Sequence, residues 1–415
     1  MQLKRVVVTG LGALTPIGNT VEEYWDGLIN GVSGADTITR FDATRFRTKF
    51  ACEVKNFDVQ AHIPRQEARK MDWFTQYAVV TADEAIKDAA FDKEQVDLDR
   101  IGVIWGAGIG GLKTFEEEVL NFGGGDGSPR FNPFFIPKMI ADSSAGLISI
   151  RHGFRGPTYV TVSACASSGN ALIDAFNYIR LGKMDICVSG GSEAAVTQAG
   201  VGGFNALKAL SERNDDPKTA SRPYDKGREG FVLGEGGAAL ILEEYEHAKA
   251  RGAKIYCEIM GGGMSSDAYH ITAPHPEGRG AYMCMKLALE DAELPLEAVD
   301  YINTHGTSTP IGDPQELKAI ERLFGEHASK LNISSTKSMT GHLLGGAAAI
   351  EAVAAILAIK NQLVPPTINH FEDDPEINPN LNLTFNKAQA RKVDVAISNT
   401  FGFGGHNTCV VFKKI

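Results

Sequence analysis

The sequence has few of the features that mark membrane, secreted or nucleic-acid-binding proteins. Its longest run of small apolar residues, 343–359, is interrupted by Glu351, which is typical of a buried helix and not of a membrane span. The first residues include Lys4 and Arg5 but only a short apolar run, so we expect no signal peptide and a cytoplasmic protein. The net charge of −10 argues against nucleic acid as the main partner.

Several common metal-binding and catalytic motifs are also absent from the sequence. The six cysteines have no regular spacing and form no C-x-x-C pair, so we expect free thiols in a reducing compartment and no zinc site. No G-x-S-x-G, H-E-x-x-H or P-loop motif occurs, which removes the commonest hydrolase, zinc-protease and nucleotide-binding classes. His270 and His275, near Asp267, lie in an irregular stretch that favours a surface loop, so we assign no metal.

One glycine-rich segment imitates a dinucleotide-binding loop. Residues 106–111 read G-A-G-I-G-G after an apolar run, and Asp126 follows at a suitable distance. Asp126, however, lies in a loop of glycines and not at the end of a second strand. We therefore do not expect nicotinamide binding.

The 415 residues do contain a repeated alternation of β-branched runs, glycine-rich turns and helical patterns, which predicts an α/β protein with a large core. A second pattern divides the chain. The sequences G-E-G-G at 234–237 and G-F-G-G at 402–405 each lead into a strand-like segment, and each follows an earlier strand-like segment containing Ser189 or Ser398. We therefore predict two related halves, residues 1–252 and 253–415.

A candidate nucleophile, Cys165, lies between a predicted strand at 158–163 and a predicted helix at 169–180. Because the N-terminus of a helix favours an anion, we expect the pKa of this thiol to lie below its free value of about 8.5. A thiolate is a good acyl acceptor. The alternative is a small buried hydrophobic residue, as most cysteines are. The turn crowded with serine and alanine favours the nucleophile.

Two histidines occupy turns rich in glycine, threonine and serine in the second half. His305 follows a predicted strand at 299–302, and His342 comes shortly after Lys337, where another helix begins. A histidine at a helix N-terminus is held in its neutral form, which leaves its ring able to donate a hydrogen bond to an oxygen gaining negative charge. Either histidine alone is more commonly a loop or core residue. Their shared setting favours a catalytic interpretation.

Four motifs identify a family that this chain resembles. They are, in order, T-V-S-A-C-A-S-S at 161–168, N-T-H-G-T-S-T at 303–309, S-T-K-S-M-T-G-H at 335–342 and S-N-T-F-G-F-G-G at 398–405. On these motifs the chain resembles the β-ketoacyl-acyl carrier protein synthases over essentially its whole length, and it is most similar to type II. The resemblance implies a thiolase-like α/β fold, in which two similar halves pack into five layers, αβαβα, with the active site at their junction.

The resemblance also implies a reaction. Such enzymes elongate fatty acids by joining acyl and malonyl groups that acyl carrier protein (ACP) carries as thioesters, with loss of carbon dioxide. By this resemblance Cys165 accepts the acyl group, His305 and His342 hold the malonyl thioester carbonyl, and Lys337 orders the site together with Glu351. No separate cofactor is expected, because the phosphopantetheine arm arrives on ACP.

Further roles are implied in the same way. Thr307 and Thr309 would contact the phosphopantetheine arm, and Phe403 would act as a gate whose backbone amide forms an oxyanion hole with that of Cys165. The other implied substrate-binding residues are Phe204, Ile109 and Thr272. The implied docking residues for ACP are Arg69, Lys70, Arg130 and Lys208. A homodimer is expected by resemblance, and His406 departs from the threonine that the family usually has.

Three alternatives stay open to comparison. A ketosynthase of a polyketide or specialised fatty-acid pathway shares every motif and is the main one. A thiolase would carry a second catalytic cysteine in the loop where this chain has His406. A non-catalytic carrier-binding partner would be expected to lack the nucleophile that Cys165 supplies.

Overall fold

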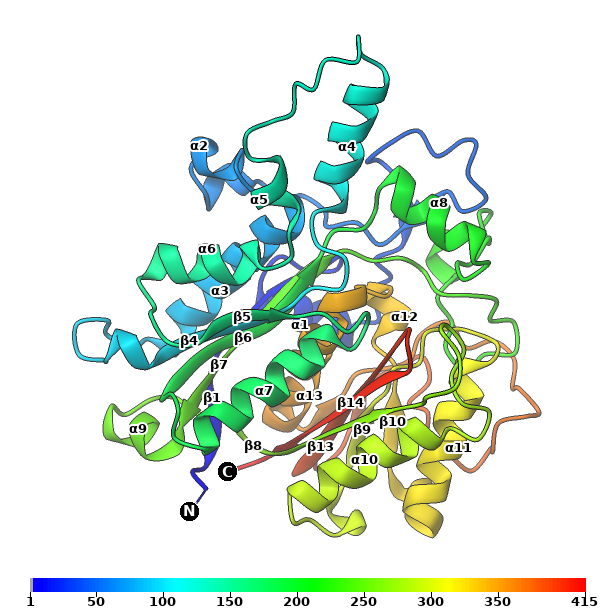
Figure 1. The fold of residues 1–415 in the computed structure, drawn as a ribbon. Helices are drawn as coiled ribbons and strands as arrows, with labels where there is room; N and C mark the ends of the chain where they lie inside the picture. The colour runs from blue at the N-terminus through cyan, green and yellow to red at the C-terminus, as the bar shows by residue number, and fades with distance from the viewer. Residues whose placement is uncertain (1–2) are drawn as a thin grey trace.

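A ten-stranded sheet runs through the computed structural model, which describes residues 3–415 (Figure 1). Its strand order is β10-β9-β13-β14-β8-β1-β7-β6-β4-β5. The strands are β1 (Val6–Leu14), β4 (Ile101–Gly106), β5 (Thr158–Thr161), β6 (Ile186–Glu193), β7 (Gly236–Glu244), β8 (Cys257–Ser266), β9 (Tyr301–Asn303), β10 (Asn332–Ser334), β13 (Val395–Gly402) and β14 (His406–Lys413). Two small sheets pair β2 (Asp36–Thr37) with β3 (Phe50–Ala51) and β11 (Leu363–Val364) with β12 (Gln389–Ala390).

The large sheet consists of two halves with the same topology. Outward from the centre, the strands are β1, β7, β6, β4 and β5 on one side and β8, β14, β13, β9 and β10 on the other. In each half the first three strands pair antiparallel and the outer pairings are parallel. The halves join where Val6, Val7 and Val8 pair with β8. The predicted internal repeat is therefore confirmed, while the cut between residues 252 and 253 stays a prediction.

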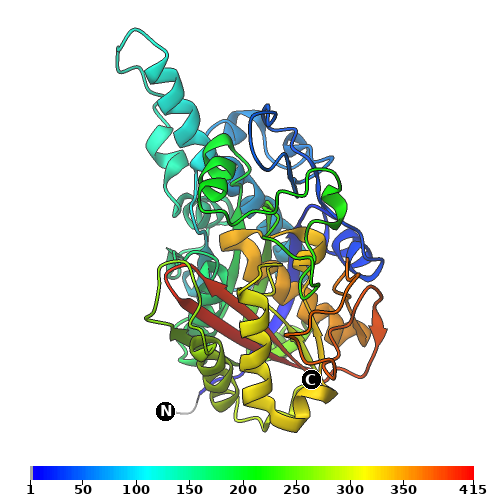
Figure 2. The same ribbon diagram turned by 90° about the vertical axis from the view of Figure 1, so that its right-hand side faces the viewer.

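Helices separate and cover the two halves of the sheet (Figures 1 and 2). On one outer face, α3 (Trp73–Ala89) packs on β1 and β7, and α6 (Ser143–His152) packs on β4. Between the halves, α7 (Ser167–Arg180) lies against β6 and β4, and α13 (Ala347–Asn361) lies against β13. On the other face, α10 (Arg279–Asp291) covers β8 and β14 and contacts α11 (Gly312–Phe324). These five layers are those of the predicted thiolase-like fold.

The central helix α13 is the one that the apolar run at 343–359 predicts. Every residue from Ala347 to Ile359 is buried. The segment 344–361 is long and apolar enough to cross a membrane, but 89% of it is buried inside the protein. The prediction of a core helix is confirmed. Because α13 is enclosed, the charge of Glu351 has to be balanced from within the protein.

The remaining helices connect these layers or stand out from them. They are α1 (Val21–Ile29), α2 (Arg65–Ala68), α4 (Leu112–Gly123), α5 (Phe135–Met139), α8 (Gln198–Ala206), α9 (Tyr245–Ala250) and α12 (Lys337–Thr340). In Figures 1 and 2, α4 and α5 project from the body of the protein. Several of their apolar side chains are exposed, among them Phe115, Leu120 and Ile136.

Candidate active site

Cys165 lies in a sharp turn between β5 and α7. The turn requires a left-handed backbone at Ala164, whose φ is 51°. The Ser167 hydroxyl stabilises it, since Oγ accepts the Ser163 amide hydrogen at 2.9 Å and donates to the Ala164 carbonyl at 2.6 Å. Cys165 therefore faces the interior just before the first turn of α7, and it is buried.

The predicted low pKa of Cys165 is wrong. Burial raises the pKa of the thiol to about 12, because the interior disfavours a thiolate. The charge of Lys337 and the backbone amides of Phe403 and Cys165 lower this pKa, but by less than burial raises it. The sequence shows the helix terminus but not the depth at which the turn lies. The Cys165 side chain is therefore a protonated thiol at neutral pH.

A neutral histidine is in direct contact with this thiol. The Nε2 atom of His342 lies 3.0 Å from the Sγ atom of Cys165. Burial lowers the pKa of His342 well below its usual range, and Lys337 lowers it further. The pKa of His305 is also lowered well below its usual range, by burial, by the charge of Lys337 and by His342. The ring centroids of His305 and His342 lie 5.2 Å apart. The predicted neutral histidines are confirmed.

The cause of this neutrality differs from the predicted one. Neither ring depends on a helix terminus: α11 begins only at Gly312, and His342 lies between α12 and the turn that leads into α13. Desolvation and a nearby cation are sufficient. Both rings have a buried Nδ1 atom without a hydrogen-bond partner in the described part of the chain.

The cation is Lys337, the first residue of α12, which forms a buried ion pair with Glu351 of α13. Burial raises the pKa of Glu351 to about 7, while Lys337 opposes this rise. The Thr400 hydroxyl also donates to Glu351, at 3.3 Å. The pair keeps a positive charge beside the two histidines in a region closed to solvent.

The Phe403 loop closes over Cys165 through a glycine that has no room for a side chain. A Cβ atom on Gly402 would lie 2.8 Å from the Ser163 carbonyl oxygen and 3.1 Å from the Cys165 amide nitrogen. This close approach brings the Phe403 amide to the Cys165 sulfur. The next residue, Gly404, donates to the Ile271 carbonyl at 2.7 Å. His406 is exposed, and its ring lies beside Gly404, which has a left-handed backbone with a φ of 86°.

Sequence reasoning missed Glu193, the last residue of β6. Its buried carboxylate accepts the amide hydrogens of Gly108 (2.8 Å), Gly110 (3.1 Å) and Gly345 (3.1 Å), as well as that of Ile109. Burial raises its pKa to about 7. The glycine-rich loop at 106–111 thus surrounds a carboxylate of the protein itself, which explains its likeness to a phosphate-binding loop.

Glu316 of α11 was also missed. Its carboxylate accepts the amide hydrogens of His305 at 2.9 Å and Gly306 at 2.8 Å, so it fixes the turn that carries His305. Burial raises its pKa to about 7. The sequence offers one signal for this contact, an acidic residue in the helix that follows the His305 turn.

The predicted substrate-binding residues lie on different sides of this centre. The hydroxyl groups of Thr307 and Thr309 are 3.1 Å apart, close after His305 in the chain. Phe204 packs against Phe231, which in turn packs against His342. Phe204 and Phe231 belong to an apolar cluster that includes Cys165. The two remaining residues are more open: Ile109 is exposed, and Thr272 donates its amide hydrogen to His270.

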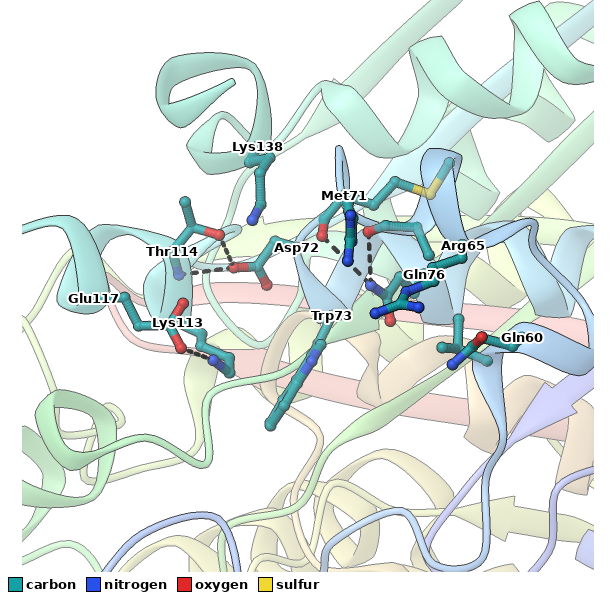
Figure 3. A pocket seen from close by; sticks show the side chains of 13 residues that line it. Gln60, Arg65, Met71, Asp72, Trp73, Gln76, Lys113, Thr114, Glu117 and Lys138 are labelled. Atoms are coloured by element: carbon teal, nitrogen blue, oxygen red, sulfur yellow. Dashed lines mark hydrogen bonds and ion pairs between the residues drawn. The ribbon is translucent and has the colours of Figure 1, made fainter. Parts of the chain in front are cut away.

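The predicted docking residues are all exposed. Arg69 lines a cavity of about 350 Å³, together with Arg65, Lys113 and Lys138. Figure 3 shows the side chains of Arg65, Lys113 and Lys138 around this cavity, with Trp73 at its side. Lys70 lies over the ring of Phe134, on the segment that also carries Arg130. Lys208 comes after α8, a helix that contacts α4. Basic side chains thus lie near the base of the projecting helices, while Arg130 lies in the loop that joins α4 to α5.

No group of three or more His, Cys, Asp or Glu side chains within residues 3–415 has an arrangement suited to a metal ion. All six cysteines are free and buried.

Comparison with known proteins assigns the chain to a family. Residues 3–248 match the N-terminal domain of β-ketoacyl synthase, and residues 256–371 match its C-terminal domain. The chain is 51% identical to 3-oxoacyl-(acyl-carrier-protein) synthase 2 of Synechocystis sp., with 100% of this chain and 99% of the relative aligned. It is 49% identical to the protein of the same description from Staphylococcus aureus strain COL, with the same coverage.

Solved structures agree with this assignment. A β-ketoacyl synthase from Burkholderia phymatum has a TM-score of 0.92 and 37% identity, with 99% of this chain and 100% of that one covered. AntDE:AntF, a type II polyketide synthase acyl carrier protein in complex with its ketosynthase bound to the hexaketide, has a TM-score of 0.90 and 34% identity, with both chains fully covered. The protein described here therefore belongs to the β-ketoacyl synthase family of condensing acyltransferases.

Proposed function

We propose that this enzyme elongates fatty acyl chains by condensing acyl-ACP with malonyl-ACP, which yields 3-oxoacyl-ACP, carbon dioxide and free ACP. The observation that carries this proposal is the contact of 3.0 Å between His342 Nε2 and Cys165 Sγ, with the neutral ring of His305 beside it. Relatives of about half-identical sequence described as 3-oxoacyl-(acyl-carrier-protein) synthase 2 support the substrate class.

In the first half-reaction, Cys165 attacks the carbonyl carbon of acyl-ACP. Its proton passes to Nε2 of His342 as the carbon–sulfur bond forms, because a free thiolate is disfavoured in this setting. The backbone amides of Cys165 and Phe403 stabilise the oxyanion. The bond to the carrier sulfur then breaks, and the departing thiolate takes up the proton held by His342. The products are acyl-Cys165 and free ACP.

In the second half-reaction, malonyl-ACP loses carbon dioxide and becomes an enolate. Neutral His305 and His342 can each donate an N–H to the enolate oxygen, whereas imidazolium would lose its proton to it. The enolate carbon attacks the acyl-Cys165 carbonyl, the carbon–sulfur bond breaks with its electron pair on sulfur, and the Cys165 thiolate takes up one proton from water. Lys337, held by Glu351, favours the neutral histidines because a cation opposes a second positive charge.

The surroundings of Cys165 fit the two parts of an acyl thioester. The apolar cluster of Cys165, Phe231 and Phe204 offers a lining for the acyl chain, and the exposed side chain of Ile109 is proposed to contact it as well. Thr307, Thr309 and Thr272 provide hydroxyl groups for the phosphopantetheine arm, and Phe403 serves as the gate. No metal and no bound cofactor takes part.

We also infer that acidic ACP docks on the basic surface made by Arg69, Lys70, Arg130 and Lys208. The AntDE:AntF complex, a ketosynthase with its own acyl carrier protein, supports a carrier partner. Opposite charges increase the rate of encounter more than the affinity. Docking beside the projecting helices would present the arm to the Cys165 side of the molecule. We propose no nucleic acid or membrane partner, and we place the enzyme in the cytoplasm.

A homodimer is the assembly that the exposed apolar surface supports. The strand β5 is an edge of the sheet, and near it Val162 is 63% exposed and Ile150 is 77% exposed. Such an edge is a template for strand pairing. A second copy that pairs with β5 would cover these side chains. Sedimentation velocity should give the mass of a dimer.

Product analysis tests the proposed function. Purified enzyme, malonyl-ACP and acyl-ACPs of graded length should give, by mass spectrometry, 3-oxoacyl-ACPs that are each two carbons longer. Repeated extension without reduction, giving poly-β-ketone products, would instead establish the polyketide alternative, which the AntDE:AntF complex represents among the solved structures.

A further inference from the structure

A second chemically organised cluster lies away from Cys165, on the outer face of the first half. It joins Asp83 of α3, His152 at the end of α6 and Lys93 in the loop after α3. The Nε2 atom of His152 lies 2.7 Å from Asp83 Oδ1, and its Nδ1 atom lies 2.8 Å from Lys93 Nζ. The condensation described above uses none of these residues.

The partners of His152 determine where its proton lies. An ionised carboxylate can only accept a hydrogen bond, so Nε2 carries the proton, which leaves Nδ1 as an acceptor facing the lysine. Burial raises the pKa of Asp83, but hydrogen bonds from His152 and Arg151 outweigh this and hold it below its usual value. Asp83 is therefore ionised at neutral pH. This is the arrangement in which an imidazole acts as a base.

The cluster is also held in place. The His152 ring stacks on Phe154 with centroids 5.4 Å apart, and only 11% of the His152 side chain is exposed. Arg151 binds Asp83 and also Glu67, so the charged groups that face the histidine are Asp83, Arg151 and Lys93 itself. Lys93 keeps part of its surface open to solvent. Burial lowers the pKa of Lys93, and Arg151 adds to this while Asp83 opposes it.

We propose that Lys93 is an acylation site, at which His152 acts as base for attack of the lysine amine on an acyl thioester. The neutral amine of Lys93 attacks the thioester carbonyl carbon, and Nδ1 of His152 takes the proton that the nitrogen loses as the amide forms. The carbon–sulfur bond breaks with its electron pair on sulfur, and the thiolate takes up the proton from His152. The products are an acyl-lysine and a free thiol.

The chemistry of the family makes such donors available, because its substrates are acyl thioesters. Acylation would remove the positive charge of Lys93 and separate it from His152. The proposal concerns a surface distinct from Cys165 and does not depend on which acyl chains the enzyme elongates.

A labelling experiment with the full-length protein tests the proposal. The protein is incubated with S-acetyl-N-acetylcysteamine near neutral pH, treated with hydroxylamine to remove any thioester on Cys165, and digested for quantitative mass spectrometry. Lys87, which is exposed on α3, serves as the internal reference. We expect Lys93 to be acetylated about a hundred times faster than Lys87, the lower end of the range for general-base assistance.

The matched variant is His152→Asn, whose amide oxygen can still accept a hydrogen bond near the Nδ1 position but cannot take a proton. We expect the advantage of Lys93 to disappear in this variant while condensing activity stays at the wild-type value, and the lost stacking on Phe154 should lower the melting temperature only modestly. An advantage that survives His152→Asn, or no advantage in the wild type, would overturn the proposal.

The pH dependence of the wild type gives a second readout that needs no variant. The ratio of Lys93 to Lys87 labelling should be largest near neutral pH and should fall as the pH approaches about 10, where an ordinary lysine loses its proton without help. A ratio close to one at every pH would contradict a role for His152.

Discussion

Nε2 of His342 lies 3.0 Å from Sγ of Cys165, and burial affects the two groups in opposite directions. It raises the pKa of the thiol to about 12 and lowers that of the imidazole well below its usual range. At neutral pH the pair is therefore a thiol and a neutral imidazole, not a thiolate and an imidazolium. The reactivity of Cys165 then depends on proton transfer to His342 during the attack.

Replacing His342 and replacing His305 should therefore affect the rates of the two half-reactions differently. His342→Ala should slow both half-reactions, because it takes away the group that contacts the sulfur. His305→Ala should leave radiolabelled acyl transfer to Cys165 largely intact and slow decarboxylation of malonyl-ACP about a hundredfold or more, the loss expected for one oxyanion donor. Loss of acyl transfer in His305→Ala with decarboxylation preserved would show that the roles are reversed.

Lys337→Ala should shift the pH profile of the enzyme. Lys337 lowers the pKa of both histidines, so its removal raises those values and imidazolium forms at a higher pH. Activity should then be lost earlier on acidification, which is seen as an acid limb of kcat/KM that moves to higher pH. Lys337→Arg keeps the cation and is the control. An unmoved acid limb in Lys337→Ala would contradict the electrostatic role.

Gly402→Ala should damage the oxyanion hole through steric pressure alone. The added methyl group would press on the Ser163 carbonyl and on the Cys165 amide, so the Phe403 loop has to move away. Acyl transfer should fall about a hundredfold or more if one oxyanion donor is displaced. Gly203→Ala, where a Cβ atom meets nothing within 4 Å, should behave as wild type. Equal rates in the two variants would count against this oxyanion hole.

The double change Arg69→Glu and Lys70→Glu tests the docking surface. It should raise KM for acyl-ACP severalfold at low ionic strength, and the effect should fade as salt is added, because screening acts over about 8 Å at physiological ionic strength. Alkylation of Cys165 by iodoacetamide should not change. If KM and its salt dependence match those of the wild type, ACP docks elsewhere.

The sequence predicts the residues of the site better than their chemistry. Motifs place Cys165, His305 and His342 in glycine-rich and serine-rich turns, and the structure brings these turns together. The direction of the Cys165 pKa could not be predicted, because a helix terminus is visible in a sequence and its depth is not. Glu193 and Glu316 act through backbone amides that only the folded chain brings near, so neither carboxylate has a motif of its own.

The fold shows the same division. The repeated G-x-G-G sequences predict two halves, and β7 and β14 follow these sequences at equivalent places in the sheet. The pairing of β1 with β8, which joins the halves, involves only three residues of each strand and has no local signal. Long-range pairing depends on the whole core, so the sheet order had to come from the structure or from resemblance.

The central claim, condensation through acyl-Cys165, is tested most directly by isolating the intermediate. The enzyme is mixed with octanoyl-ACP, quenched and digested, and the peptide that contains Cys165 is measured by mass spectrometry; a second portion receives malonyl-ACP before the quench. We predict octanoyl-Cys165 in the first portion, and in the second its loss together with formation of 3-oxodecanoyl-ACP and carbon dioxide. Cys165→Ser should give neither species at a comparable rate. Formation of 3-oxodecanoyl-ACP by Cys165→Ser at the wild-type rate would contradict the account.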